Sequence, residues 1–119
     1  MLRTGIDIVP IARIQAAIER HGDAFLTRVF TQNEIATYRE RPASLAARWA
    51  AKEAVAKAFG TGLGAISFYE IEILSGTRNE PILTLHGNAR KTADELGLTE
   101  WAISLSHTDT DAIAVVVVQ

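Results

Sequence analysis

The sequence has 119 residues, which is the length of one domain, and we therefore expect a single domain over residues 1–119. It contains no cysteine, which excludes disulfides, thiolate metal sites and a cysteine nucleophile, and which is compatible with a reducing, cytoplasmic compartment. The net charge of −2 combines a basic and an acidic half, because residues 1–57 hold nine Lys and Arg against six Asp and Glu, and residues 58–119 hold three against eight.

The first predicted element is a strand that carries an acid. Residues 2–8 alternate, with Leu2, Ile6 and Ile8 on one parity and Asp7 on the other. The stretch is too short and too polar for a signal peptide or a membrane-spanning helix. Burying Asp7 is costly without a partner. Asp7 therefore caps the following helix, pairs with an arginine, or is one of two carboxylates that bind Mg²⁺.

Three helices are expected after this strand. Pro10 suits the first position of a helix that Gly22 ends. A short helix should follow over residues 24–29. Thr31 and Glu34 have the spacing of a capping box, so the third helix should start after Thr31.

The strongest helix pattern covers residues 43–59, between Pro42 and Gly60. Four charged side chains lie within three of its turns, namely Arg48, Lys52, Glu53 and Lys57. One carboxylate is therefore expected among three cations. The ordinary interpretation is a solvated face with an i,i+4 ion pair. In the functional interpretation, Glu53 joins Asp7 as a Mg²⁺ ligand, because Mg²⁺ takes one or two carboxylates together with phosphates and water.

The second half of the chain predicts strands with one inserted helix. The expected elements are a strand over 67–74, its hairpin partner over 82–86, a helix over 88–96 capped by Asn88 and stopped by Gly97, and a hairpin of strands over 101–107 and 112–118. Glu70 and Glu72 alternate with Ile71 and Ile73, so we expect both acids on an exposed face. The whole pattern predicts an α+β fold with a mainly antiparallel sheet.

Two further features are candidates for ligand contacts. His107 stands at the end of a predicted strand, where it is either a core histidine or a side chain that faces a ligand. Gly60, Thr61 and Gly62 can bring the backbone close to a phosphate, although they lack the full P-loop pattern.

Four blocks of the sequence carry a resemblance to a known family. They are Gly5-Ile6-Asp7-Ile8 with Arg13; Phe30-Thr31 with Glu34 and Tyr38; residues 45–54 (LAARWAAKEA) with residues 57–62 (KAFGTG); and residues 104–108 (SLSHT). In this order they resemble the holo-[acyl-carrier-protein] synthases, the short bacterial type of 4′-phosphopantetheinyl transferase. The third block is highly specific, and the resemblance covers nearly the whole chain.

The resemblance implies a reaction, a metal and an assembly. Such enzymes transfer 4′-phosphopantetheine from coenzyme A to a serine of apo acyl carrier protein, release adenosine 3′,5′-bisphosphate and support fatty acid biosynthesis. They depend on Mg²⁺, have a mainly antiparallel sheet with a long helix packed on it, and are usually homotrimers with sites between subunits. Neither nucleic acid nor a membrane is expected as a partner.

The motif match also implies roles for individual residues. Asp7 and Glu53 are the expected Mg²⁺ ligands, and Glu53 and Lys57 are the expected catalytic residues. Lys57 should also lie near the pyrophosphate of coenzyme A, and Arg13 should face acidic residues of the carrier protein. The other expected coenzyme A contacts are Arg48, Gly60, Thr61, Gly62, His107 and Thr108.

Some assignments stay open at this level. The base that accepts the serine proton is Glu53 or a Mg²⁺-bound water beside it. The basic first half matches an acidic carrier protein or merely carries solvated charges, with Arg20 and Arg28 as further candidate contacts. Thr108 stands where some relatives have Asp, and the segment before Arg48 is shorter than in many relatives.

Two alternatives to the transferase belong to other classes of protein. One is a non-catalytic oligomer that binds coenzyme A, and the other is a plain α+β interaction domain with a solvated charged helix. Binding of coenzyme A and Mg²⁺ separates the interaction domain from the other two. Turnover separates the transferase from the binding protein.

Overall fold

The computed structural model describes residues 1–60 and 66–119, so the expected coenzyme A contacts Thr61 and Gly62 lie outside the described residues. Along the chain, the elements are β1 (Arg3–Pro10), α1 (Ile11–His21), α2 (Asp23–Val29), α3 (Gln32–Tyr38), α4 (Pro42–Phe59), the 3-10 helix η1 (Phe68–Glu70), β2 (Ile71–Ser75), β3 (Pro81–Leu85), α5 (Gly87–Glu95), β4 (Trp101–His107) and β5 (Asp111–Val118).

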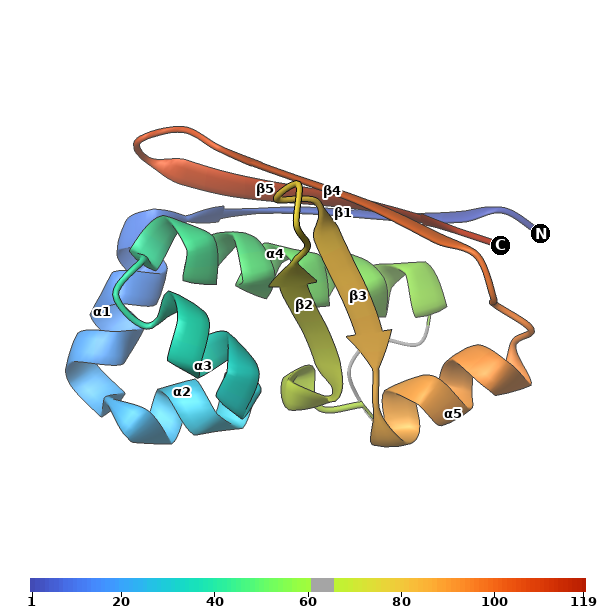
Figure 1. Ribbon diagram of the computed structural model, residues 1–119, viewed down its shortest axis with the longest axis horizontal. Helices are drawn as coiled ribbons and strands as arrows, with labels where there is room; N and C mark the ends of the chain where they lie inside the picture. The colour runs from blue at the N-terminus through green and yellow to red at the C-terminus, as the bar shows by residue number, and fades with distance from the viewer. Residues whose placement is uncertain (61–65) are drawn as a thin grey trace.

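A three-stranded antiparallel sheet covers one side of the long helix α4 (Figure 1). Its strand order is β1-β5-β4, so the first strand of the chain lies beside the last. Small and apolar side chains form the inner face of the sheet and pack on the alanine-rich α4. This arrangement confirms the predicted α+β fold with a mainly antiparallel sheet and a long helix packed on it.

The contact between β1 and α4 depends on a glycine. A Cβ atom on Gly5 would overlap the carbonyl oxygen of Ala54 and lie 3.1 Å from the amide nitrogen of Ala58. Both are backbone atoms of a helix, which cannot turn aside as a flexible side chain can. Gly5 therefore allows β1 to lie directly against α4, and Asp7, which shares the same face of the strand, is brought to the helix.

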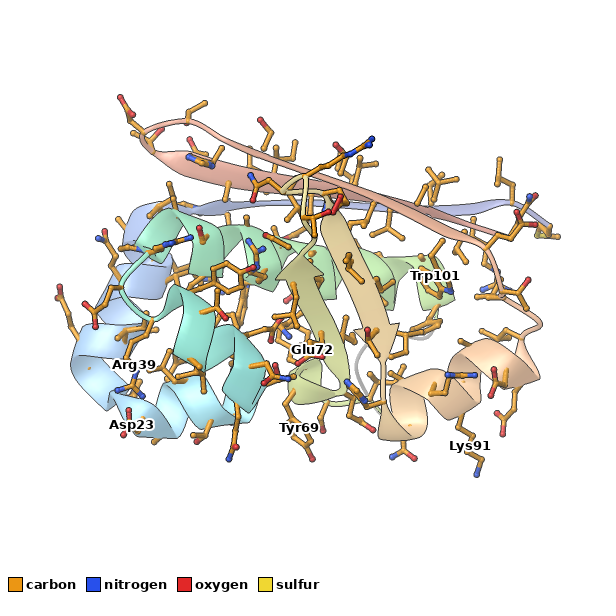
Figure 2. All side chains as sticks on the ribbon, in the orientation of Figure 1. Asp23, Arg39, Tyr69, Glu72, Lys91 and Trp101 are labelled. Carbon is orange, nitrogen blue, oxygen red and sulfur yellow. The ribbon has the colours of Figure 1, made fainter. Side chains whose placement is uncertain are left out.

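Strands β2 and β3 form a second sheet that crosses α4 beside the first sheet (Figure 1). The prediction that Glu70 and Glu72 are exposed is wrong, because both are more than nine-tenths buried. Glu72, labelled in Figure 2, accepts hydrogen bonds from the Thr31 hydroxyl at 2.6 Å and from the Asn33 amide at 3.3 Å. These bonds tie β2 to the start of α3.

The sequence predicts Asn88 as the cap of α5, but a carboxylate from outside the helix, that of Glu70, serves the start of this helix instead. The helix begins at Gly87, so His86 and not Asn88 stands at the N-cap position, and the His86 side chain makes no capping bond. Instead the Glu70 carboxylate accepts a hydrogen bond from the backbone N–H of Asn88 and another from that of Ser67, at 2.7 Å for the latter. A carboxylate from a neighbouring element thus satisfies a backbone N–H in the first turn of α5.

Helices α1, α2 and α3 lie together beside the N-terminal half of α4 (Figure 1). Arg39 and Asp23 form a 2.9 Å ion pair in this group of helices (Figure 2). The predicted capping box is present, because the Thr31 hydroxyl accepts the Glu34 N–H at 3.1 Å and the Glu34 carboxylate accepts the Thr31 N–H at 2.9 Å. Pro10 ends β1 instead of opening α1. Among the described helices, none has the length and apolar character needed to cross a membrane.

The outer face of the three-stranded sheet has no described element over it (Figure 1). Ile6 and Ile8 point outward from β1 and are 56% and 62% exposed. Val115 of β5 stands opposite Ile6 and is 37% exposed. Neighbouring apolar side chains on an open sheet face are typical of surfaces that bind another protein chain.

Candidate functional site

Two carboxylates and a lysine meet where β1 lies against the C-terminal half of α4. The Asp7 side chain is 18% exposed, and its Oδ1 lies 3.1 Å from the Nζ of Lys57. The same ammonium group donates a hydrogen bond to the carbonyl of Ile6 at 2.8 Å. Glu53 precedes Lys57 by one turn, on the same side of α4. We call Asp7, Glu53 and Lys57 the carboxylate centre.

Burial and the neighbouring Asp7 both act on the Glu53 carboxylate. Burial raises the pKa of Glu53 above its ordinary value, and the charge of Asp7 raises it further. Lys57 and Arg13 act to lower the pKa but do not offset the other two effects. A cation bound by the two carboxylates would stabilise their ionised forms there.

The donor set of the carboxylate centre fits Mg²⁺. Asp7 and Glu53 offer hard oxygen ligands, which Mg²⁺ prefers. Within residues 1–60 and 66–119, no cluster of three or more His, Cys, Asp or Glu could hold a metal by itself. Mg²⁺ usually completes its coordination with water and substrate phosphates, so two carboxylates suffice for a site that binds a phosphorylated substrate. This fits the metal ligands that the sequence predicts.

Arg13 lies in the first turn of α1 and borders the carboxylate centre. Its guanidinium carbon is 5.9 Å from the centroid of the Trp49 ring, which is within the range of a cation–π contact. Trp49 in turn packs against Phe25, with ring centroids 6.1 Å apart. Arg28, another candidate carrier-protein contact, lines a cavity of about 260 Å³ beside Trp49. Arg13 and Arg28 therefore flank a partly aromatic surface next to the carboxylate centre.

Arg48 belongs to the other side of α4, where it is almost fully buried. Its Nε donates to the carbonyl of Ile73 at 3.1 Å, and its two terminal nitrogens donate to the carbonyl of Ser44 and the hydroxyl of Ser75. Its guanidinium carbon lies 3.7 Å from the centroid of the Tyr38 ring. Burial lowers the pKa of Arg48, but an arginine remains charged at neutral pH.

Arg48 opens onto a cavity of about 360 Å³ that also contains His107. Its lining includes Tyr38, Arg41, Ser75, Asn79 and residues 103–107 of β4. We call this space the basic cavity. Sequence reasoning did not assign Arg41 or Asn79, because they stand in loops that only the folded chain places beside Arg48.

Thr108 and Gly60, unlike Arg48 and His107, do not line the basic cavity. The Thr108 hydroxyl accepts the backbone N–H groups of Thr110 and Asp111, at 3.2 and 3.1 Å, and so shapes the turn between β4 and β5. Gly60 ends α4 with φ 78°, a left-handed conformation that favours glycine. The Arg3 guanidinium donates to the carbonyl of Phe59 at 2.9 Å and thereby satisfies one of the last carbonyls of the helix.

The expected cluster of one carboxylate among three cations is wrong, because the side chains diverge around α4. Arg48 and Glu53 are five residues apart, which places them about 140° apart around a helix. Arg48 accordingly faces β2 and Glu53 faces β1. Lys52 is fully buried and pairs with Glu34 of α3 at 2.8 Å. Only Lys57 of the three cations lies beside Asp7.

Within one protomer, the expected site residues therefore form two groups. The carboxylate centre borders β1, and the basic cavity borders β4, on the opposite edge of the three-stranded sheet. In the described residues, no member of the carboxylate centre lines the basic cavity. A ligand that contacts both groups has to reach across α4 or lie between two protomers.

Comparisons with known proteins agree on one family. Residues 3–114 match the model of the 4′-phosphopantetheinyl transferase superfamily. The chain is 48% identical, over 98% of each chain, to a holo-[acyl-carrier-protein] synthase of Herpetosiphon aurantiacus. It is 50% identical to one of Moorella thermoacetica, with 100% of this chain and 94% of the relative covered. The crystal structure of the Helicobacter pylori synthase in complex with coenzyme A superimposes with a TM-score of 0.89 at 38% identity, over 98% of this chain and 99% of that one.

Proposed function

Since the chain belongs to the 4′-phosphopantetheinyl transferase superfamily, we propose that the carboxylate centre and the basic cavity are the two parts of its active site. The protein is a holo-[acyl-carrier-protein] synthase: it transfers 4′-phosphopantetheine from coenzyme A to a serine of apo acyl carrier protein and releases adenosine 3′,5′-bisphosphate. It thereby supports fatty acid biosynthesis. The grouping of Asp7, Glu53 and Lys57 at one place is the observation that carries the residue assignment.

Asp7 and Glu53 are the proposed ligands of Mg²⁺. When bound, the cation supplies positive charge to the oxygens of the reacting phosphate. The support from this chain is the raised pKa of Glu53, which burial and Asp7 cause, together with the oxygen-only donor set. Asp7 also holds Lys57 in place through their 3.1 Å ion pair.

Lys57 is the proposed contact to the pyrophosphate of coenzyme A. Its side chain is 53% exposed, and Asp7 and the carbonyl of Ile6 orient the ammonium group from one side. In phosphoryl transfer, catalysis rests mainly on positioning and on stabilisation of charge. Lys57 stabilises the negative charge that develops as the bond between the transferred phosphorus and the leaving oxygen breaks.

The carrier serine needs a proton acceptor, and Glu53 is the proposed base. The serine oxygen forms the new bond to phosphorus, adenosine 3′,5′-bisphosphate leaves with the bridging oxygen, and the serine proton passes to the Glu53 carboxylate. Burial and then the charge of Asp7 raise the pKa of Glu53 above its ordinary value, and a Mg²⁺-bound water beside Glu53 is the alternative proton acceptor.

The basic cavity is the proposed place for the nucleotide end of coenzyme A. Arg48 and His107 line it, and Arg41 adds a third basic side chain. Guanidinium groups bind phosphate with paired N–H donors. Thr108 adjoins the cavity as the next residue after His107, and Gly60, Thr61 and Gly62 remain proposed contacts along the path to the pyrophosphate.

The division of the site favours active sites between subunits, as in the homotrimer that the resemblance implies. One protomer holds the carboxylate centre and the basic cavity on opposite sides of α4, so each active site would combine the carboxylate centre of one protomer with the basic cavity of its neighbour. The open apolar face with Ile6, Ile8 and Val115 offers a surface for this assembly.

Acyl carrier protein is the proposed protein partner at the surface formed by α1 and α2. Arg13 lies beside the carboxylate centre, where the serine of the carrier must arrive. Arg28 lines the neighbouring cavity. Both can pair with acidic residues of a carrier protein. The cytoplasmic location that the cysteine-free sequence predicts stays a prediction.

Intact-protein mass spectrometry of an apo acyl carrier protein tests the proposed function directly. The carrier is incubated with this protein, coenzyme A and Mg²⁺, and the expected result is a mass gain of one phosphopantetheine that EDTA abolishes. If several carriers gain no mass in a preparation that still binds coenzyme A, the result would indicate a non-catalytic coenzyme A-binding protein. A gain that survives EDTA would refute the role of Mg²⁺.

A further inference from the structure

A fully buried ion pair links α4 to α3 and to β2. Lys52 and Glu34 lie 2.8 Å apart, and neither side chain is exposed. The Lys52 ammonium group also donates to the carbonyls of Phe68, at 3.0 Å, and of Ile71. All three of its N–H groups therefore have acceptors. Neither residue has a role in the transfer of phosphopantetheine proposed for the active site.

The pair is connected to the basic cavity through one residue of β2. The second oxygen of the Glu34 carboxylate accepts the backbone N–H of Ile73 at 2.9 Å. The carbonyl of the same Ile73 accepts the Nε–H of Arg48 at 3.1 Å. Glu34 and Arg48 thus hold the two backbone polar groups of Ile73, and Lys52 holds Glu34.

The Arg48 side chain is held in one position by contacts within the protein itself. Tyr38 lies under its guanidinium group, and three acceptors engage its nitrogens from β2 and α4. A side chain that is already ordered loses less conformational entropy on binding and so gives higher affinity. The alignment of Arg48 in the cavity depends on where the Ile73 carbonyl stands.

We propose that Lys52 and Glu34 are positioning residues for Arg48, which set the Ile73 carbonyl and so orient the guanidinium for the nucleotide end of coenzyme A. This inference rests on the proposed function, because it concerns the substrate of the same site. The pair does not touch the cavity, since neither residue lines it. Its effect should therefore fall on the affinity for coenzyme A and leave the chemical step unaffected.

The test removes both charges together, because a single substitution would leave an unpaired buried charge and would destabilise the fold for that reason alone. The variants are Glu34→Met/Lys52→Met, which removes the acceptor for the Ile73 N–H, and Glu34→Gln/Lys52→Met, which keeps one. We expect the KM for coenzyme A to rise by about tenfold in the first and by less in the second, with kcat and the KM for the carrier protein within about twofold of wild type.

Two comparisons separate positioning from general destabilisation. Leu98→Ala removes buried apolar contacts between α5 and β4, away from Arg48, and should lower stability without raising the KM for coenzyme A. In an Arg48→Gln background, the Glu34→Met/Lys52→Met change should have little further effect, because it acts through Arg48. An unchanged KM in the folded Glu34→Met/Lys52→Met protein, or effects that simply add to those of Arg48→Gln, would overturn the proposal.

Affinity for adenosine 3′,5′-bisphosphate, measured by calorimetry, gives the same comparison without turnover. If the Glu34→Met/Lys52→Met protein does not fold, the Glu34→Gln/Lys52→Met protein decides: weaker nucleotide binding supports the proposal, and unchanged binding overturns it. An inactive wild type that still binds the nucleotide would refute the transferase but not the positioning. A wild type with full activity and an Arg48→Gln variant that binds normally would overturn the positioning alone.

Discussion

Replacing Glu53 by glutamine removes one charge from the carboxylate centre and keeps the volume of the side chain. Asp7 retains its 3.1 Å ion pair with Lys57, but one of the two proposed Mg²⁺ ligands becomes neutral. Losing one electrostatic stabiliser of a transition state typically lowers kcat by about 10²–10³-fold. We expect the rate of phosphopantetheine transfer to fall by at least this factor.

The free energy of unfolding of the same variant should not fall with its activity. The folded-state pKa of Glu53 lies above its ordinary value because burial and then Asp7 disfavour the ionised carboxylate. For an acid with a raised folded-state pKa, the cost of ionisation is fully present above that pKa and disappears as the pH falls below the unfolded value of about 4.3. Metal-free Glu53→Gln protein should therefore melt no lower than wild type at pH 7, and any difference should vanish in acid.

Initial rates by mass spectrometry and melting temperatures at a fixed protomer concentration check both expectations. Glu95→Gln, a charge change on exposed α5, is the matched control and should leave rate and melting temperature unchanged. Near-normal turnover of Glu53→Gln at saturating Mg²⁺ would refute the ligand assignment. A melting temperature lower by more than about 4 °C, which corresponds to roughly 1 kcal/mol, would contradict the expected effect on stability.

Four further changes test other parts of the molecule. Gly5→Ala should lower the free energy of unfolding by about 2 kcal/mol or more, measured by urea denaturation, because its Cβ would overlap the backbone of α4. Arg13→Glu should raise the KM for the carrier protein by about tenfold and leave coenzyme A binding unchanged, because the new charge repels an acidic partner. Ile8→Lys should shift the mass in sedimentation equilibrium from that of the proposed trimer to that of a monomer, because it places a charge on the open apolar face. Glu72→Gln should lower the free energy of unfolding by about 1–2 kcal/mol at pH 7.

The pH dependence of the Glu72→Gln effect follows from the pKa of Glu72. Burial acts to raise this pKa, but hydrogen bonds from Thr31, His86 and Asn33 together bring it below the ordinary value. A lowered folded-state pKa gives stability that is fully present above the unfolded value of about 4.3 and is lost as the pH falls through the folded value. The difference between wild type and Glu72→Gln should therefore shrink below about pH 4, and a difference that grows in acid would contradict this account.

Exposed positions provide controls for two of the other three changes. Thr4→Ala, on the outer face of β1, should leave stability nearly unchanged if Gly5 acts through its contact with α4. Arg90→Glu, on exposed α5, should leave the KM for the carrier protein unchanged. If Ile8→Lys stays trimeric, the open face of the sheet is not the subunit interface.

Local signals in the sequence account for most of the elements and for one half of the site. The capping box of Thr31 and Glu34, and Gly60 as the end of α4, stand as predicted, because both depend on residues a few positions apart. The alternation in β1 placed Asp7 on the face opposite Ile6 and Ile8, and that face lies against α4. Glu53 and Lys57 are one helical turn apart, so their common side of α4 also follows from local geometry.

Only the tertiary structure decided which partner each charged side chain of α4 meets. Helical spacing places Arg48, Lys52 and Glu53 at different angles around one axis, but it does not say which element packs at each angle. The fold places β1 beside Glu53, β2 beside Arg48 and the α3 carboxylate of Glu34 beside Lys52.

The same reason explains why Glu70 and Glu72 are buried despite an alternation typical of an exposed strand. Their partners are the N–H groups of α5 and the side chains at the start of α3, which are remote in sequence. The sequence by itself thus determined the family, the elements and the carboxylates that face the substrate phosphate in our proposal. Tertiary packing decided the division of the site around α4, because long-range contacts select the neighbours of every buried charge.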